Sequence, residues 1–229
     1  MSQLFDMASA SIRELNHTLH LHNGGSDQKS YRVINPHGLH TLAVGIDAPL
    51  TVDIEGHVGY YCAGMNKHAT VTVHGNAGPG VAENMMSGCV RIIGSASQYA
   101  GATAHGGLLI IEGDASSRCG ISMKGVDIVV KGRVGHMSAF MGQTGRLVVC
   151  GDAGEALGDS IYEARLYVRG AVAGLGADCV EKTMKDKHKR ELEDLLNAAG
   201  ISGADAAEFR RFGSARRLYH FNVDNADAY

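Results

Sequence analysis

Two groups of histidines near the N-terminus are, by residue type, the best candidates for binding a metal ion. They are His17, His20 and His22, followed by His37 and His40. Neutral imidazole is a common metal ligand, but no cysteine or carboxylate completes a convincing ligand set around these residues. We therefore expect surface histidines and no metal site in this chain.

The cysteines are the candidate nucleophiles, and none of them lies in a Cys-x-x-Cys pair or a recognisable catalytic signature. A catalytic Cys–His pair is not excluded by the sequence alone, although buried cysteines usually act as small apolar fillers. The N-terminal region has no basic segment followed by an apolar one, so we expect no export signal. Because the number of cysteines is also odd, we expect a cytoplasmic protein with reduced thiols. These residues are Cys62, Cys89, Cys119, Cys150 and Cys179.

A third candidate is a possible phosphate-binding loop formed by Gly151, Gly154 and Gly158. A phosphate loop needs a following Lys-Ser or Lys-Thr and a surrounding βαβ unit, and the sequence has neither. We therefore expect no catalytic and no cofactor-binding residue in this chain.

Composition excludes other classes of function. The chain has 229 residues, with 21 basic and 24 acidic side chains, no tryptophan and 6% aromatic residues. This balance argues against a protein built to bind nucleic acid, and no apolar run of about 18 residues predicts a membrane span. The 31 glycines are the outlier, at about twice their usual share of roughly 7%.

The glycines recur with a period of 19 residues. Apolar side chains stand two and four residues before each glycine, so each copy reads as a short strand with alternating faces. We expect a positive φ at the glycine, which ends the strand in a sharp turn. The seven glycines are Gly56, Gly75, Gly94, Gly113, Gly132, Gly151 and Gly170.

Stacked coils would bury the apolar side chains that a single coil cannot bury alone. The repeat therefore predicts an all-β fold, a right-handed parallel β-helix (β-solenoid) of about seven 19-residue coils. Stacking also places charged residues of neighbouring coils together. Asp114, Arg133 and Asp152 should be neighbours, and so should Glu112 and Lys131.

The two ends of the chain lack the repeat, and a solenoid needs caps at its ends. We divide the chain into an N-terminal helix and lead-in segment (1–50), the β-helix (51–177) and a C-terminal helical cap and tail (178–229). Ser11 with Glu14 predicts a capping box at the first helix, and Asp178 with Glu181 predicts one at the second. Gly200 is a plausible end of that helix. A short helix over 205–211 and a strand over 218–223 are expected to follow.

Six methionines lie between the glycine-ended strands. They are either fillers of the core or a soft surface for partner subunits. These residues are Met65, Met85, Met86, Met123, Met137 and Met141.

The repeat resembles the GXGXG domain at the C-terminal end of the large subunit of glutamate synthase. Gly151, Gly154 and Gly158 fit that family's Gly-x-x-Gly-x-x-x-Gly motif in full, whereas other coils match it only in part. The chain is more similar to stand-alone GXGXG proteins of bacteria, over nearly its whole length. The matching segments are 56–66 (GHVGYYCAGMN), 82–88 (AENMMSG), 118–130 (RCGISMKGVDIVV), 135–141 (GHMSAFM), 151–164 (GDAGEALGDSIYEA) and 209–221.

This resemblance implies a non-catalytic scaffold subunit of a glutamate-synthase-type complex, in particular an N-methylglutamate synthase. The implied partners are a class II glutamine amidotransferase-like subunit and a glutamate-synthase-like subunit that carries FMN and an iron–sulfur cluster. The fold also resembles a subunit of formylmethanofuran dehydrogenase and its formyltransferase/hydrolase relative, so a scaffold in such a complex is the alternative. An independent enzyme with a substrate groove on the solenoid is a third interpretation.

Overall fold

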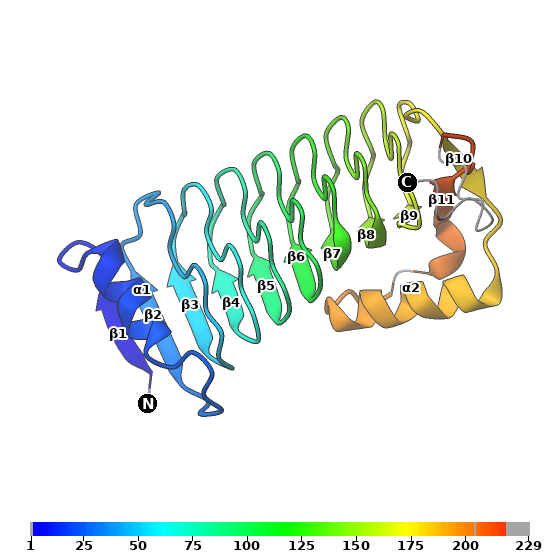
Figure 1. Ribbon diagram of the computed structural model, residues 1–229. Coiled ribbons are helices and arrows are strands. Elements are labelled where there is room, and N and C mark those ends of the chain that lie inside the picture. Colours follow the sequence, from blue (N-terminus) through cyan, green and yellow to red (C-terminus); the bar gives the residue numbers. More distant parts are fainter. Residues whose placement is uncertain (1, 204, 219–229) are drawn as a thin grey trace, which may run out of the picture.

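The computed structural model describes residues 2–203 and 205–218, and its strands form one sheet that runs the length of a rod (Figure 1). In this sheet β1 to β9 follow chain order and pair in parallel, and the edge is closed by β11 and then β10. The strands of the regular coils are β3 (Thr51–Glu55), β4 (Thr70–Val73), β5 (Cys89–Ile92), β6 (Leu108–Ile111), β7 (Lys124–Val130), β8 (Thr144–Val149) and β9 (Arg165–Val168).

The register between strands confirms the 19-residue coil. Val52 pairs with Val71, which pairs with Val90, and the same step continues through to Leu166 in β9. A second ladder of isolated bridges runs beside the sheet from Val58 to Val172 with the same spacing. The fold is therefore a parallel β-solenoid of about seven coils, as the glycine period predicts, and its right-handed sense stays a prediction.

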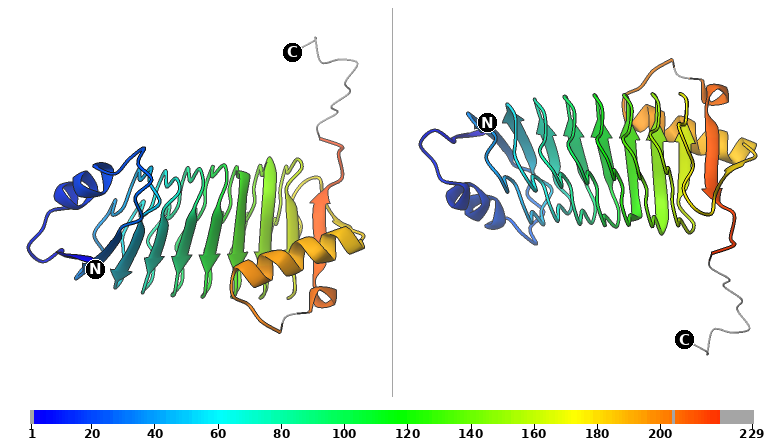
Figure 2. Two further views of the ribbon diagram at one scale, coloured as in Figure 1. Left: turned by 90° about the horizontal axis from the view of Figure 1, so that it is seen from below. Right: turned by 90° about the horizontal axis from the view of Figure 1, so that it is seen from above.

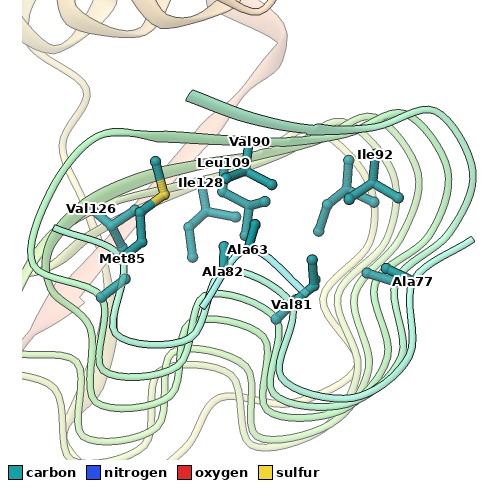
Figure 3. Packing of buried hydrophobic residues seen from close by; sticks show 14 of the residues in the cluster. Ala63, Ala77, Val81, Ala82, Met85, Val90, Ile92, Leu109, Val126 and Ile128 are labelled. Carbon is teal, nitrogen blue, oxygen red and sulfur yellow. The ribbon is translucent and has the colours of Figure 1, made fainter. Parts of the chain in front are cut away.

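Like residues stack in columns inside the rod. Figure 3 shows Val90, Leu109 and Ile128 following one another along the axis, with Met85 and Val126 beside them. All five side chains are fully buried. Full burial stabilises an aliphatic side chain by about 1.5–3 kcal/mol, so the columns are the main source of cohesion between coils.

The glycine column serves a purpose other than the expected one. Of the seven repeat glycines only Gly56 has a positive φ, at 135°, so the expectation is wrong for the other six. Their backbones approach the preceding coil closely instead. A Cβ on Gly151 would lie 2.7 Å from the carbonyl oxygen of Gly132, and the Gly151 N–H donates to that same oxygen at 2.9 Å. Glycine is needed because the two backbones touch.

Two of the predicted charge pairs are present between neighbouring coils, whereas the Asp152 carboxylate bonds to the backbone of the next coil. Arg133 Nε lies 3.2 Å from Asp114 Oδ2, and Lys131 pairs with Glu112. Asp152 accepts a backbone N–H from the next coil at 2.7 Å. The register derived from the repeat is thus correct at the surface as well as in the core.

The N-terminal segment adds an irregular start to the rod. Strands β1 (Gln3–Asp6) and β2 (Ser30–Ile34) extend the sheet in parallel ahead of β3. Helix α1 (Ile12–His20) lies between them in sequence, and its predicted capping box is confirmed. Ser11 Oγ accepts the Glu14 N–H at 3.2 Å, and the Glu14 carboxylate accepts the Ser11 N–H at 2.7 Å.

The C-terminal segment differs from the sequence prediction. Residues 179–182 form strand β10 (Cys179–Lys182), so the capping box assigned to Asp178 and Glu181 is wrong. Helix α2 (Asp186–Ala198) starts later. Its C-cap is Ala199, and Gly200 follows with a φ of 73°, so the expected glycine stop lies just past the helix end. The short helix is a single 3₁₀ turn, η1 (Ala206–Glu208), followed by strand β11 (Arg210–Ser214). Of the strand predicted over 218–223, all but Leu218 lies outside the described residues.

Strand β11 closes the last coil, and helix α2 lies along the outside of the rod (Figure 2). β11 pairs antiparallel with β9 and β10. The apolar side of α2 packs on outward-facing residues of β6 to β9, where Ile110, Val129, Val148 and Tyr167 are buried. The C-terminal end of the sheet is therefore capped by strands β11 and β10, while the helix forms a second apolar layer.

Candidate functional site

Three of the histidines considered as metal ligands instead form hydrogen bonds in the irregular N-terminal segment and at the first regular coil. His20 Nε2 lies 2.6 Å from the Val44 carbonyl oxygen, and His22 Nε2 lies 2.6 Å from the Tyr31 hydroxyl. His40 Nδ1 accepts the N–H of Tyr60 at 2.9 Å. Across residues 2–203 and 205–218, no group of three or more histidine, cysteine or acidic side chains is placed to hold a metal ion.

All five cysteines carry free thiols. Burial raises the pKa of Cys62, Cys119 and Cys179 to about 12, and it also raises the pKa of Cys89 and Cys150. The thiolate is the nucleophilic form of cysteine. These side chains are therefore protonated at neutral pH and pack as small apolar groups.

The six methionines divide between the two roles considered for them. Met85 and Met123 are buried in the core, and Met137 is half-buried. Met65, Met86 and Met141 are exposed, with 47%, 47% and 42% of their surface accessible. The exposed three lie on the side of the rod that connects the strands, and we call this side, formed by 59–69 and the equivalent residues of later coils, the loop face.

The loop face is hydrogen-bonded as regularly as the sheet. In the first regular coil Tyr61, Ala63 and Met65 all have a positive φ, between 53° and 61°. Tyr61 and Met65 donate their N–H groups to the next coil at 2.9 and 2.8 Å, whereas Ala63 donates to the preceding coil at 2.9 Å. Positive φ is uncommon outside glycine and persists only where surroundings enforce it. The repeated alternation therefore marks a rigid face.

Side chains on this face also bond from coil to coil. Asn84 Nδ2 donates to the Tyr61 hydroxyl at 3.2 Å, and Thr103 Oγ1 donates to Asn84 Oδ1 at 2.6 Å. Beside this polar line, Met65 and Met86 lie on adjacent coils, since the Met86 N–H donates to the Asn66 carbonyl at 2.8 Å. We call Met65 and Met86 the methionine patch. It offers an apolar contact on a rigid support.

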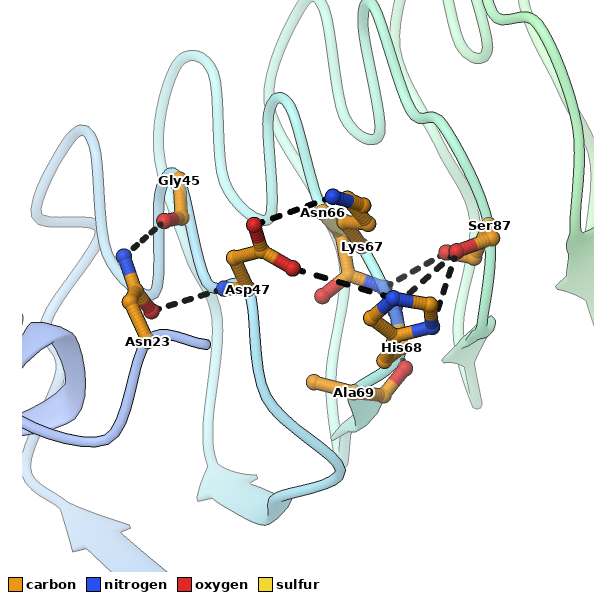
Figure 4. A network of polar contacts seen from close by, with 8 residues as sticks. All are labelled: Asn23, Gly45, Asp47, Asn66, Lys67, His68, Ala69 and Ser87. Carbon is orange, nitrogen blue, oxygen red and sulfur yellow. Dashed lines mark hydrogen bonds and ion pairs between the residues drawn. The ribbon is translucent and has the colours of Figure 1, made fainter. Parts of the chain in front are cut away.

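A polar network next to the methionine patch contains the three residue types of a hydrolytic triad (Figure 4). Asp47 Oδ1 lies 3.7 Å from His68 Nε2, and His68 Nδ1 lies 3.5 Å from Ser87 Oγ. A nucleophile and its base are usually about 2.6–3.2 Å apart. Ser87 Oγ accepts the His68 N–H at 3.1 Å, and Asp47 is paired with Lys67 at 3.0 Å. This geometry ties three coils together.

This network is not among the predicted sites, because its members are far apart in the chain. Asp47, His68 and Ser87 are separated by roughly one coil each, so the period itself would have predicted their proximity. Beside them, the buried Asn66 donates to the carbonyls of Ala69 and Ser87. Its Oδ1 has no hydrogen-bond partner in the part of the chain that the structure describes. The corner is thus polar and internally bonded.

No helix among the described residues is long and apolar enough to cross a membrane. No protein-family model matches the chain. The sequence is 64% identical over 226 residues to Protein GlxC of Rhizobium meliloti (strain 1021), and the alignment covers 99% of both proteins. With this identity over its whole length, the chain belongs to the GlxC protein family.

Proposed function

We propose that the chain is a non-catalytic scaffold subunit of a glutamate-synthase-type complex, and more specifically of an N-methylglutamate synthase. The complex would convert methylamine and L-glutamate to N-methyl-L-glutamate and ammonia. A class II glutamine amidotransferase-like subunit and a glutamate-synthase-like subunit with FMN and an iron–sulfur cluster would be the catalytic partners. This chain would hold them apart and help wall the path of the amine or ammonia, which limits loss to solvent.

The rigidity of the rod carries this proposal. Both the sheet and the loop face are bonded from coil to coil, so the rod resists bending on two sides. At a strand spacing of about 4.8 Å, strands β1 to β9 span roughly 38 Å. A rod of this kind can fix the separation of two bound proteins, which a flexible linker cannot do.

The chemistry of the chain's own groups also supports a scaffold. The thiols are buried with a raised pKa, and the distances between Asp47, His68 and Ser87 exceed those of an aligned triad. The closest approach of nucleophile and base in this network is therefore a weak contact. Catalysis would then belong to the partners.

The methionine patch is the proposed contact with a partner subunit. Methionine side chains are flexible and polarizable and adapt well to a binding surface. Met65 and Met86 are both about half exposed on a backbone that the loop-face hydrogen bonds hold still. Association can then bury apolar area without ordering a loop.

The test is to purify the tagged chain at native abundance from its source and identify the chains that accompany it. The same fraction is assayed for methylamine-dependent formation of N-methylglutamate. We expect an FMN protein, an amidotransferase-like chain and that activity in one complex. A chain that runs alone after mild crosslinking would contradict the scaffold role, and partners from a formyl-transfer complex would contradict the N-methylglutamate synthase assignment.

A paired variant tests the contact itself. Met65→Glu with Met86→Glu places two charges in the methionine patch and should release the partners, because a charge at a desolvated contact is costly. Ile93→Glu is the matched control, since Ile93 is 45% exposed but lies just beyond β5, away from the loop face. Equal recovery of partners with the double variant and the control would refute docking at the patch.

A further inference from the structure

A cavity of about 390 Å³ opens where the start of helix α2 meets strands β9, β10 and β11. We call it the basic pocket. Among the described residues, its lining includes one carboxylate, that of Glu163, and the imidazole of His188. Six permanently charged cations also line it: Arg165, Lys182, Lys185, Lys187, Arg211 and Arg216.

Two of these cations are neutralised within the protein. Arg165 pairs with Glu191, and Arg216 Nη2 lies 2.7 Å from Glu163 Oε1. Among the described residues, no carboxylate lies within ion-pair distance of the four that remain, Lys182, Lys185, Lys187 and Arg211. The pocket thus holds an excess of positive charge in a chain whose net charge is −3.

The placement of these cations works against the stability of the fold. Lys185 is the N-cap of α2, and Lys187 lies in its first turn. A helix N-terminus carries a partial positive charge and favours anions. Asp186 offsets part of this charge, but the lysines repel both the helix terminus and one another. Burial of Arg211 adds to the cost, because a charged group loses hydration there.

His188 provides a neutral donor in the same place. The side chain is 5% exposed, and its Nδ1 accepts the Lys185 N–H at 3.2 Å. Since Nδ1 accepts, the proton of the neutral ring is on Nε2. No described residue accepts a hydrogen bond from Nε2, and this atom stays accessible from the pocket, so the donor is available to a ligand.

We propose that the basic pocket binds a small organic oxyanion with at least two negative charges, a phosphate ester or a dicarboxylate. Arg211 Nε donates to the Thr183 carbonyl oxygen at 3.2 Å, which leaves the two terminal nitrogens of its planar guanidinium to donate to paired oxygens of an anion. The lysines supply charge, and His188 supplies a hydrogen bond. A volume of about 390 Å³ lies within the range of roughly 300–1,000 Å³ that is typical of small-molecule sites.

Calorimetric titration of the full chain at constant ionic strength tests the proposal. The probes are inorganic pyrophosphate for the phosphate class and succinate for the dicarboxylate class, with chloride as the monovalent reference. We expect saturable binding of one anion per chain by one of these two multiply charged probes. That probe identifies the chemical class. No saturable binding by either probe would overturn the proposal.

Variants then locate the site. Arg211→Gln should weaken binding by about tenfold or more, as the loss of a charge-assisted hydrogen bond implies. Lys187 is exposed, so its replacement carries little risk to folding. Lys187→Gln should weaken binding by about threefold. Arg190→Gln makes the same charge change on α2 outside the pocket lining and should leave the affinity unchanged. Equal losses in all three variants would refute the site, as would tighter binding of a short polyglutamate peptide than of either probe.

Discussion

Replacing Gly151 by alanine tests the close approach of neighbouring coils. The added Cβ would lie 2.7 Å from the carbonyl oxygen of Gly132, 2.8 Å from its carbonyl carbon and 3.0 Å from the backbone nitrogen of Arg133. All three atoms belong to the backbone, so no side-chain rotation can relieve the contact. The two coils must separate locally.

The magnitude follows from what this separation breaks. Gly151 donates to Gly132 at 2.9 Å, and Gly170 donates to Gly151 at 3.1 Å. Each backbone hydrogen bond is worth about 1 kcal/mol, and overpacking costs about 1–3 kcal/mol. We therefore expect Gly151→Ala to lower the free energy of unfolding by about 3–5 kcal/mol, from two lost hydrogen bonds and the overpacking.

Equilibrium urea denaturation followed by far-ultraviolet circular dichroism measures this change, since the chain has no tryptophan. Gly213→Ala is the matched control. Its Cβ would meet nothing closer than 3.7 Å and its φ is not in the left-handed region, so its effect should stay within about 0.5 kcal/mol. Hydrogen exchange should quicken at the Gly151 and Gly170 amides and not in β3. Equal stability of the Gly151→Ala variant and the parent would refute the argument from backbone contact.

Two further predictions concern the second apolar layer and the thiols. Leu196→Ala should destabilise the chain by about 2–4 kcal/mol, because Leu196 is buried against the outer face of the sheet. Asn197 is exposed on the same helix, so Asn197→Ala should change the stability little. Thermal melts of the two variants make the comparison. Between pH 7 and 9, a disulfide reagent should label Cys89 first and leave Cys62 and Cys119 unmodified, because their pKa is raised to about 12. Rapid labelling of Cys62 in the folded protein would contradict this.

The period of 19 residues was sufficient to predict the coil, its register and its core. Once apolar residues recur two and four positions before each glycine, every coil must present the same residues to its neighbours, as the pairing of Val52 with Val71 and Val90 shows. Repetition turns a local pattern into a long-range one. The charge pair of Asp114 and Arg133 could be derived in the same way.

The repeat also contains a signal for the docking of helix α2, which was not among the predictions. The outward residue three positions before the glycine is polar in the early coils, as at Asp53 and Arg91, and becomes apolar from Ile110 onward. This switch marks the strands that a second layer covers. An exposed apolar stripe on one part of a solenoid is thus a usable signal for a packed cap.

Tertiary structure alone decided the position of the groups outside the repeat. Lys182, Lys187 and Arg211 reach one cavity because β11 folds back between β9 and β10. The position of a residue outside the repeat cannot be derived from an equivalent residue in the next coil. Its contacts therefore depend on how the last segment packs. The sequence by itself therefore determined the rod, by repeating one strand and one turn. The chemistry at its end required the fold, because only packing brings distant and unrelated residues together.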